Sequence, residues 1–294
     1  MSASISPPLV ASPSRVILRR ASRHTGLIAS GTVLAVIVAL AVAAPLIAPH
    51  DPTFQSLGGR LTPPVFLGGT WDHPLGTDAL GRDYLSRLLY GAGVSLMIGV
   101  TAAFVSAIIG TTLGIVAGYF GGVADTVITF LINVRLAMPV VLIALAVVSL
   151  FGGSLLVVTL VLGLLLWDRF AVVLRSATMQ VRRQEYIAAA EILGAPVSRV
   201  LVKDVLPNVM NSLIVIGTIE MAHAILLEAA LSFLGLGVQP PTPSWGLMIS
   251  EGKEMLLFDT WLITIPGVCL ATLVLAINMF GDGLRDVTAP EGRN

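Results

Sequence analysis

The chain has 294 residues and no net charge, and 55% of its residues are hydrophobic whereas only 12% are charged. A soluble domain of this length could not hide so much apolar surface, so the composition indicates a membrane protein. The zero net charge gives no electrostatic reason to expect a nucleic acid partner. Cys269 is the only cysteine, which excludes a disulfide within the chain, and its apolar surroundings favour a small side chain buried in a helix.

Uncharged stretches long enough to cross a membrane dominate the sequence. A helix rises 1.5 Å per residue and the hydrocarbon layer is about 30 Å thick, so one crossing needs about 20 residues. The run from Leu136 to Trp167 fits two crossings if it breaks at residues 152–154, and residues from Val123 form an interfacial lead-in to the first of these. The sequence thus predicts an all-α, polytopic fold with six spans: Leu27 to Ala48, Gly93 to Tyr119, Met138 to Phe151, Leu155 to Leu174, Asn208 to Leu234 and Thr260 to Gly281.

Basic residues beside the spans predict the orientation, because they are retained in the cytoplasm. With a cytoplasmic amino terminus, thirteen Lys and Arg residues lie inside and four outside. We therefore expect both termini in the cytoplasm. The expected regions are a tail over 1–26, the first span and an outer loop over 27–92, a transmembrane core over 93–284 and a tail over 285–294. The inner residues are Arg15, Arg19, Arg20, Arg23, Arg135, Arg169, Arg175, Arg182, Arg183, Arg199, Lys203, Arg285 and Arg293, and the outer ones Arg60, Arg82, Arg87 and Lys253.

A cleaved signal peptide is the alternative interpretation of the first span. The small residues Ala41-Val-Ala43 resemble a cleavage site. The apolar run is longer than that of a signal peptide, however, and Pro45 lies just past the cut, so an uncleaved span is favoured.

The outer loop from Pro49 to Ala92 contains a segment with two unlike faces. On a helix its apolar side chains gather on one side and its polar side chains largely on the other, which favours a short helix at the membrane interface. A surface helix with solvated charges is the alternative. The apolar residues are Tyr84, Leu85, Leu88 and Leu89, and the polar ones are Arg82, Asp83, Ser86 and Arg87.

Small residues recur every four positions in the second span. Such spacing lets two helix backbones approach closely, which is how membrane helices associate without a hydrophobic driving force. We therefore expect a buried helix-packing face formed by Ala102, Ser106, Gly110, Gly114 and Gly118.

A polar, alanine-rich segment separates the fourth and fifth spans. It is too short and too polar to cross the bilayer, but its apolar residues recur with helical spacing. Gly194 can end a first short helix in a left-handed turn, and Pro196 can begin a second one. The segment therefore predicts a helix-turn-helix outside the membrane, in a loop over residues 182–207. One apolar stripe consists of Tyr186, Ala189, Ala190 and Leu193, and the matching one of Val197, Val200 and Leu201.

Ionisable residues lie within the fifth span. Glu220 and His223 are three residues apart and therefore occupy neighbouring positions on a helix. A charge that faces lipid costs about 2.5–3.5 kcal/mol on insertion scales, so we expect this pair to face a translocation pathway or a partner subunit. A neutral pair that holds two helices together is the alternative. Glu228 is a further candidate for the pathway.

Three segments resemble one known family. They are Glu185-Tyr-Ile-Ala-Ala-Ala-Glu-Ile-Leu-Gly194 with Leu206-Pro207 downstream, Glu228-Ala-Ala-Leu-Ser-Phe-Leu-Gly-Leu-Gly237 with Gln239-Pro-Pro-Thr-Pro-Ser-Trp-Gly246, and Gly76-Thr-Asp-x-x-Gly-Arg-Asp-x-x-Ser-Arg87. The first is similar to the EAA motif. From Arg15 to Pro290 the chain resembles the C-type permease subunits of dipeptide, oligopeptide and nickel ABC importers, which implies a type I ABC importer fold with a cytoplasmic coupling loop.

In that family the EAA loop docks into a groove on the ATPase subunit. The chain departs from the family pattern at Ala188, where glutamate is common, at Asp204, where histidine is frequent, and at Val172, where a basic residue is usual. These departures concern single polar contacts and leave the loop's length unchanged. The resemblance implies a coupling role for Glu185, Tyr186, Ala188, Ala189, Ala190, Leu193, Gly194, Leu206 and Pro207.

The sequence predicts a non-catalytic subunit. A phosphate-binding loop needs Gly-x4-Gly-Lys and then Ser or Thr, and neither Lys203 nor Lys253 fits that pattern. The four histidines are scattered, so no catalytic, cofactor or metal site is expected. The resemblance implies ATP and Mg²⁺ on partner subunits: two ABC ATPases or one fused dimer. It also implies a homologous B-type permease, an extracytoplasmic solute-binding protein, and a bacterial plasma membrane as the location.

An intramembrane protease and a secondary transporter are the alternative classes of protein. An intramembrane protease would need a nucleophile or a His-Glu-x-x-His motif, and that motif does not occur. A secondary transporter would share many spans and buried carboxylates, but no repeat between the two halves is evident. The solute is undetermined, because relatives carry dipeptides, longer peptides, glutathione, heme or nickel complexes.

Overall fold

The computed structural model describes residues 19–288. Arg15, Pro290, Arg293 and most of the predicted first tail lie outside these residues. Within them the chain is helical apart from an outer loop and short connections, and no β-strand is present. The prediction of an all-α fold is confirmed.

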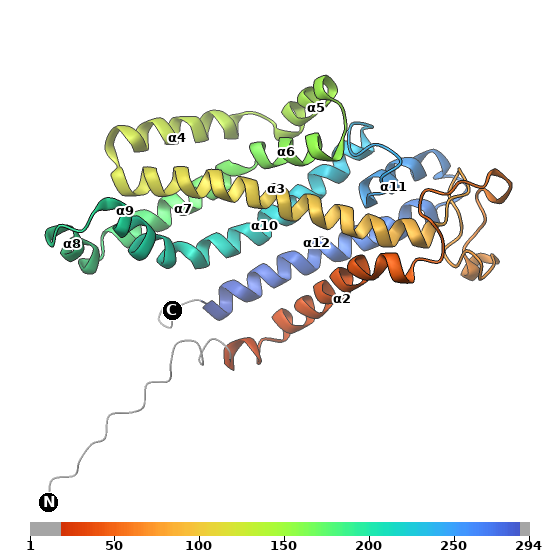
Figure 1. Ribbon diagram of the computed structural model, residues 1–294, viewed down its shortest axis with the longest axis horizontal. Coiled ribbons are helices and arrows are strands. Elements are labelled where there is room, and N and C mark those ends of the chain that lie inside the picture. Colours follow the sequence, from red (N-terminus) through yellow and green to blue (C-terminus); the bar gives the residue numbers. More distant parts are fainter. Residues whose placement is uncertain (1–18, 289–294) are drawn as a thin grey trace, which may run out of the picture.

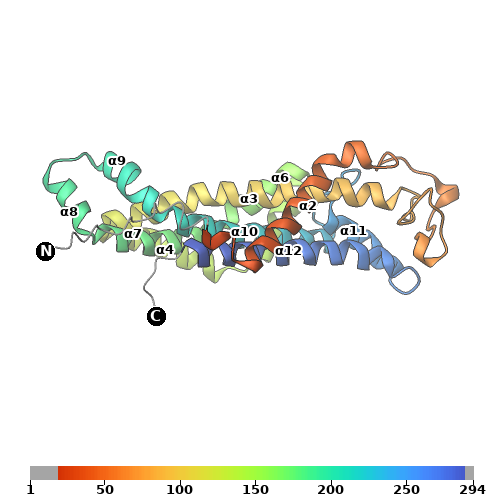
Figure 2. The ribbon, with the colours of Figure 1, turned by 90° about the horizontal axis from the view of Figure 1, so that it is seen from below.

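The long helices lie side by side in an elongated bundle (Figure 1). The loop between α2 and α3 lies at one end of the bundle, and α8 and α9 project at the other end (Figure 2). Five helical segments are long and apolar enough to cross a membrane, and a bent pair makes a sixth. The α-helices are α2 (Thr25–Ile47), α3 (Tyr84–Phe120), α4 (Gly122–Ala137), α5 (Val140–Phe151), α6 (Leu155–Leu165), α7 (Trp167–Arg182), α8 (Glu185–Ile192), α9 (Val197–Arg199), α10 (Leu206–Phe233), α11 (Trp245–Gly252) and α12 (Trp261–Thr288). Short 3₁₀ turns occupy Leu57–Gly59, Val65–Leu67 and Lys253–Met255, and Val200–Val205 is π-helical.

The predicted boundaries of the third span are wrong. The longer helix is α4, which lies along α3, whereas α5 is bent away from α4 by 82°. Pro139 disfavours a helical conformation at the residue before it, and Met138 is extended with φ −97° and ψ 126°. The residues expected to form an interfacial lead-in are therefore the longer helix of this bent pair.

The predicted interfacial helix is also wrong, because its residues open the second span. α3 runs without interruption from Tyr84 to Phe120, and Asp83 caps it by accepting a 2.7 Å hydrogen bond from the Ser86 N–H. Of the apolar residues of this segment, Tyr84 packs inward: it is 1% exposed, and its hydroxyl donates to the Leu262 carbonyl. Leu85, Leu88 and Leu89 are half-buried.

The charges of this segment are buried rather than solvated. Arg82 Nε lies 2.6 Å from Asp78 Oδ2, and Arg82 Nη2 lies 2.9 Å from Glu251 Oε1 on α11. Arg87 pairs with the same two carboxylates and is 1% exposed. Burial acts to lower the pKa of Arg82, but attraction to Glu251 and Asp78 outweighs burial and raises it, so the guanidinium stays charged. These ion pairs fasten the outer loop to α3 and α11.

The small residues of the second span lie where α3 packs on α6 and α7. A β-carbon on Gly114 would lie 2.7 Å from the Ala171 carbonyl oxygen and 2.9 Å from Leu174 Cβ. A β-carbon on Gly118 would lie 2.6 Å from the Arg175 carbonyl oxygen. The full buried set is Ala102, Ser106, Gly110, Gly114 and Gly118. Only small residues at these positions of α3 allow α3 and α7 to lie this close.

Candidate functional site

The loop that joins α7 to α10 folds as two short helical segments around a glycine turn. Gly194 has φ +78°, the left-handed conformation that follows many helix ends. The Ala195 N–H donates to the Ala190 carbonyl at 3.0 Å, and the Gly194 N–H donates to the Glu191 carbonyl at 3.0 Å. This pattern is a Schellman motif, which satisfies the last carbonyls of α8.

The second segment of the loop continues into α10. After α9 the chain passes through the π-helical residues Val200–Val205, and the Leu206 N–H donates to the Leu201 carbonyl. Pro207 has no N–H, and its ring would clash with a carbonyl four residues earlier in a regular α-helix. The wider π turn removes that conflict. The predicted second short helix is thus the start of one helical stretch, and Leu206 and Pro207 lie inside it.

Contacts to the bundle hold the loop in place. Ile187, Val200 and Val205 are each at most 1% exposed and pack against the ends of α3, α7 and α10. The Tyr119 hydroxyl donates to Glu191 Oε1 at 2.8 Å, and the Arg182 guanidinium lies 5.2 Å from the Tyr119 ring centroid. One face of the loop therefore packs on the bundle. The sequence analysis did not identify Ile187, Tyr119 or Glu191 as residues that hold the loop in place.

The opposite face of the loop exposes apolar side chains. Ile192 and Leu193 are each 85% exposed, and Tyr186 is 45% exposed. Of the predicted stripe, Tyr186, Ala189 and Leu193 lie on this face, while Ala190 is half-buried against the bundle. We call the exposed group the coupling surface; it consists of Tyr186, Ala189, Ile192, Leu193 and Val197, and Glu185 and Ala188 are exposed beside it.

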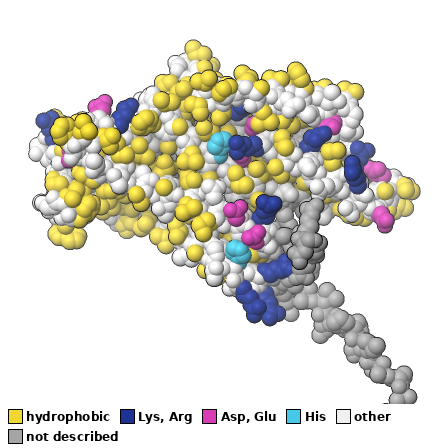
Figure 3. Space-filling model, turned by 180° about the vertical axis from the view of Figure 1, so that it is seen from behind, with side chains coloured by type: hydrophobic (Ala, Val, Ile, Leu, Met, Phe, Trp, Pro, Cys, Tyr) yellow, Lys and Arg dark blue, Asp and Glu magenta, His cyan; other side chains and the backbone are white. Residues whose placement is uncertain are grey.

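A polar cluster interrupts the apolar surface of the bundle near its middle. On the face shown in Figure 3, a His side chain and neighbouring charged side chains lie among hydrophobic ones near mid-length, and further charged side chains lie toward the two ends and the lower edge. Glu220 on α10 is fully buried, and its Oε1 lies 3.2 Å from Arg169 Nη1 on α7. His223 Nδ1 lies 3.3 Å from Glu220 Oε2, and the side chains of Arg169 and His223 are 50% and 28% exposed.

Arg169 was not identified as a pathway residue from the sequence. It is 51 positions from Glu220 along the chain. In the sequence it is recognisable only as a basic residue near the inner end of a span. In the structure the pair joins α7 to α10 and leaves a partly exposed guanidinium and imidazole. The cluster can therefore both tie two helices together and present charge to whatever covers this face.

Glu228 lies in a different environment from Glu220. It is fully buried, and its Oε1 accepts hydrogen bonds from Ser232 at 2.7 Å and from Ser244 at 2.9 Å. Ser244 also caps α11 by accepting from the Leu247 N–H. Within the described part of the chain, Glu228 joins α10 to the start of α11 and has no exposed surface.

Comparison with known proteins identifies related chains. Residues 110–293 match the family described as "Binding-protein-dependent transport system inner membrane component". Residues 12–64 match "N-terminal TM domain of oligopeptide transport permease C".

Curated relatives are similar over most of their length. The Haemophilus influenzae "Dipeptide transport system permease protein DppC" is 41% identical over 89% of this chain and 89% of its own. The Pseudomonas aeruginosa "Di/tripeptide transport system permease protein DppC" is 39% identical over 96% and 94%. The Pectobacterium atrosepticum "Glutathione transport system permease protein GsiD" is 35% identical over 96% and 92%.

A solved structure shares the fold. A chain of the inward-facing MetNI methionine ABC transporter superposes with a TM-score of 0.58. It is 18% identical, and the match covers 69% of this chain and 97% of the other. The type I ABC importer fold expected from the sequence is therefore confirmed.

Proposed function

The chain belongs to the binding-protein-dependent transport inner membrane components, and we propose that it is the C-type permease of an ATP-driven importer of dipeptides and oligopeptides. Two relatives at 39–41% identity are named for dipeptides or tripeptides, which favours short peptides as the solute. The relative named for glutathione makes that tripeptide the second candidate.

The observation that carries the proposal is the coupling surface. Large apolar side chains on a seated helical loop, at the end of the bundle opposite the outer loop, are typical of a protein-docking site. The chain has no phosphate-binding loop, so ATP and Mg²⁺ would be held by a partner. Two ABC ATPases, or one fused dimer, would dock here and transmit their closure through α8 to the bundle.

The same geometry supports an orientation. His24 at the start of α2 lies 3.4 Å from Asp286 near the end of α12, so the two ends of the described chain lie together. The helix α8, the start of α2 and the end of α12 all lie in the left half of the bundle in Figure 1, away from the outer loop. We propose that this side is cytoplasmic and that the outer loop meets an extracytoplasmic solute-binding protein.

The cluster of Arg169, Glu220 and His223 supports a partner-facing side. A partly exposed guanidinium at mid-length would be costly against lipid tails. A homologous B-type permease across this face would cover the cluster and complete a pathway between the two subunits.

Cross-linking tests the docking assignment. Leu193 and Leu257 are 85% and 89% exposed and lie at opposite ends of the bundle, so they form a matched pair. In a Cys269→Ser background, Leu193→Cys should cross-link to the ATPase subunits in membranes, and Leu257→Cys should not. An impermeant maleimide added to intact cells should label only Leu257→Cys. Cross-linking from position 257 and none from 193 would reverse the assignment.

A further inference from the structure

Two histidines far apart in the sequence meet in the outer loop. His50 follows α2, and His73 lies in the loop before α3; their ring centroids are 4.6 Å apart. Asp72 lies beside both: its Oδ1 is 3.8 Å from His50 Nε2, and its Oδ2 is 3.7 Å from His73 Nε2. One ligand atom from each of the three residues lies within 4.8 Å of the others.

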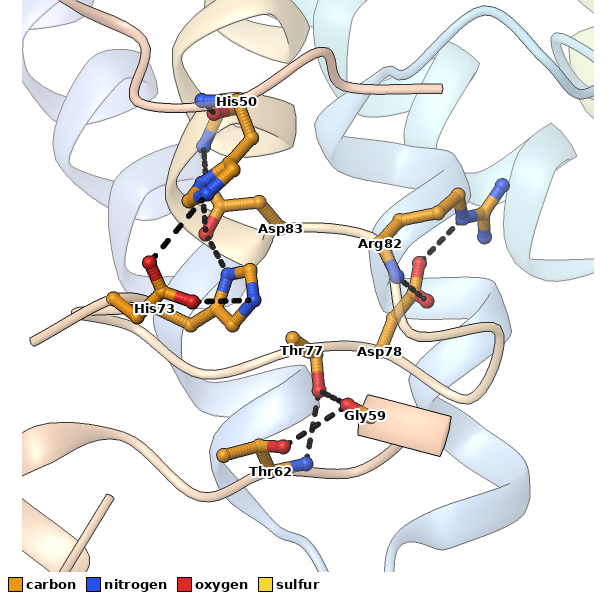
Figure 4. A network of polar contacts seen from close by, with 10 residues as sticks. His50, Gly59, Thr62, His73, Thr77, Asp78, Arg82 and Asp83 are labelled. Carbon is orange, nitrogen blue, oxygen red and sulfur yellow. Dashed lines mark hydrogen bonds and ion pairs between the residues drawn. The ribbon is translucent and has the colours of Figure 1, made fainter. Parts of the chain in front are cut away.

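A buried carboxylate lies beside both rings and is hydrogen-bonded to the ring of His73. Asp83 Oδ1 lies 2.9 Å from His73 Nδ1 and 3.7 Å from His50 Nδ1, and the Asp83 side chain is fully buried. Both rings turn toward Asp83 in Figure 4. A histidine that uses Nδ1 toward a carboxylate has its Nε2 free to bind a metal ion, and this arrangement is common in metal sites. His73 makes this contact, whereas His50 Nδ1 faces the same carboxylate at 3.7 Å and has no hydrogen-bond partner.

The charges of the cluster are compatible with a bound cation. In residues 19–288 the ion pairs of Asp83 are with His50 and His73, which are neutral unless protonated, and Asp72 pairs with the same two rings. With neutral imidazoles no fixed positive charge faces the buried Asp83 carboxylate, while the Asp72 carboxylate is 76% exposed and is also solvated by water. A divalent cation would offset both charges at once.

The ligand set selects the kind of cation. Imidazole nitrogen with one carboxylate suits Zn²⁺ and Ni²⁺, whereas Ca²⁺ and Mg²⁺ require oxygen ligands. Bonds of about 2.0–2.2 Å in a tetrahedral site place ligand atoms about 3.3–3.6 Å apart. The ligand atoms of the cluster lie within 4.8 Å of one another, so metal binding would draw the three side chains together by up to about 1.5 Å. Three protein ligands would leave the fourth position to water.

We propose that His50, His73 and Asp72 form a binding site for a divalent transition-metal ion, with Asp83 as the residue that positions the imidazole of His73 and faces that of His50. Asp83 is also the cap of α3, and the His50 N–H donates to Ser86 Oγ at 3.1 Å. A bound ion would therefore tie the end of α2 and the outer loop to the start of α3. This inference does not depend on which solute the transporter carries.

Metal titration of the purified transporter tests the site directly. The full-length chain, co-purified with its partner subunits through a tag without histidines, is titrated with Zn²⁺ by calorimetry and with Co²⁺ by absorption. We expect one additional ion per copy of this chain compared with a His50→Ala/His73→Ala double variant, and visible Co²⁺ bands of a tetrahedral site in the wild type. Equal stoichiometry in both proteins, or no tetrahedral Co²⁺ bands, would overturn the proposal.

Two further variants separate binding from folding. His24→Ala removes a histidine that pairs with one carboxylate, Asp286, near the other end of the bundle, and it should bind Zn²⁺ like the wild type. His50→Gln/His73→Gln keeps polar side chains and should fold, yet should lose at least about 100-fold in affinity. Asp83→Asn should weaken binding by about 10–100-fold while the ligands remain. Full affinity in the Gln variant would show that the imidazoles are not ligands.

Discussion

Gly194 is the residue on which the shape of the coupling loop depends most. Its φ of +78° is accessible to glycine, and no heavy atom lies within 4 Å of where its β-carbon would be, so conformation alone limits the substitution. Asparagine tolerates this backbone, whereas a β-branched residue does not. The turn sets the direction in which α9 leaves α8.

We predict that Gly194→Val impairs coupling far more than Gly194→Asn. The left-handed conformation costs about 1–2 kcal/mol for an ordinary side chain, enough to shift the turn and misplace the coupling surface. Membrane insertion should be normal for both, because no span is changed. Co-purification of the ATPase subunits and stimulation of their activity measure the effect. Equal losses in both variants would show that backbone conformation is not the reason.

The polar cluster on α7 and α10 yields a prediction about water access. His223 is partly exposed and Ala224 beside it is fully buried. In a Cys269→Ser background, His223→Cys in the assembled transporter should react with a water-soluble thiol reagent in at least one nucleotide state, and Ala224→Cys should not. If position 223 is protected in every state, the cluster serves only to hold helices together.

At the scale of elements, the contact between α3 and α7 leaves no room for larger side chains at the glycines of α3. Gly114→Leu would place side-chain atoms where Ala171 and Leu174 already lie, and overpacking of this kind costs about 1–3 kcal/mol or more. Gly267→Leu is the matched control, because nothing lies within 4 Å of its β-carbon position on α12. We predict a lower yield of folded complex in detergent, by size-exclusion chromatography, for Gly114→Leu only. Equal yields would contradict the packing role.

Elements whose signals are local in the sequence were predicted well. The spacing of four from Ala102 to Gly118 and the turn at Gly194 each depend on neighbours in the same segment. The interface helix was wrong because the charges of Arg82 and Arg87 are paired with Glu251, which is more than 160 positions away. When such a distant partner is not known, charged residues that alternate with apolar ones predict a helix whose charged face is solvated. The same limit hid Arg169 as the partner of Glu220, and the meeting of His50 with His73.

On the scale of the whole molecule, the two ends of the bundle carry loops of different kinds. One end carries a loop whose buried face is fixed to three helices and whose outer face is apolar. The other carries a long outer loop fastened by buried ion pairs to α3 and α11. α3 and the stretch from Val197 to Phe233 each run between these ends over 37 residues.

The most direct test of the central claim is peptide uptake by proteoliposomes that contain the purified transporter. With ATP on the coupling-loop side and loaded binding protein on the other, a labelled dipeptide should accumulate against its gradient. The variant Ala189→Arg, which places a charge in the coupling surface, should reduce accumulation at least tenfold without loss of the permease from the membrane. Uptake that proceeds without ATP, is driven by an ion gradient and is unchanged in Ala189→Arg would contradict the account and identify a secondary transporter instead.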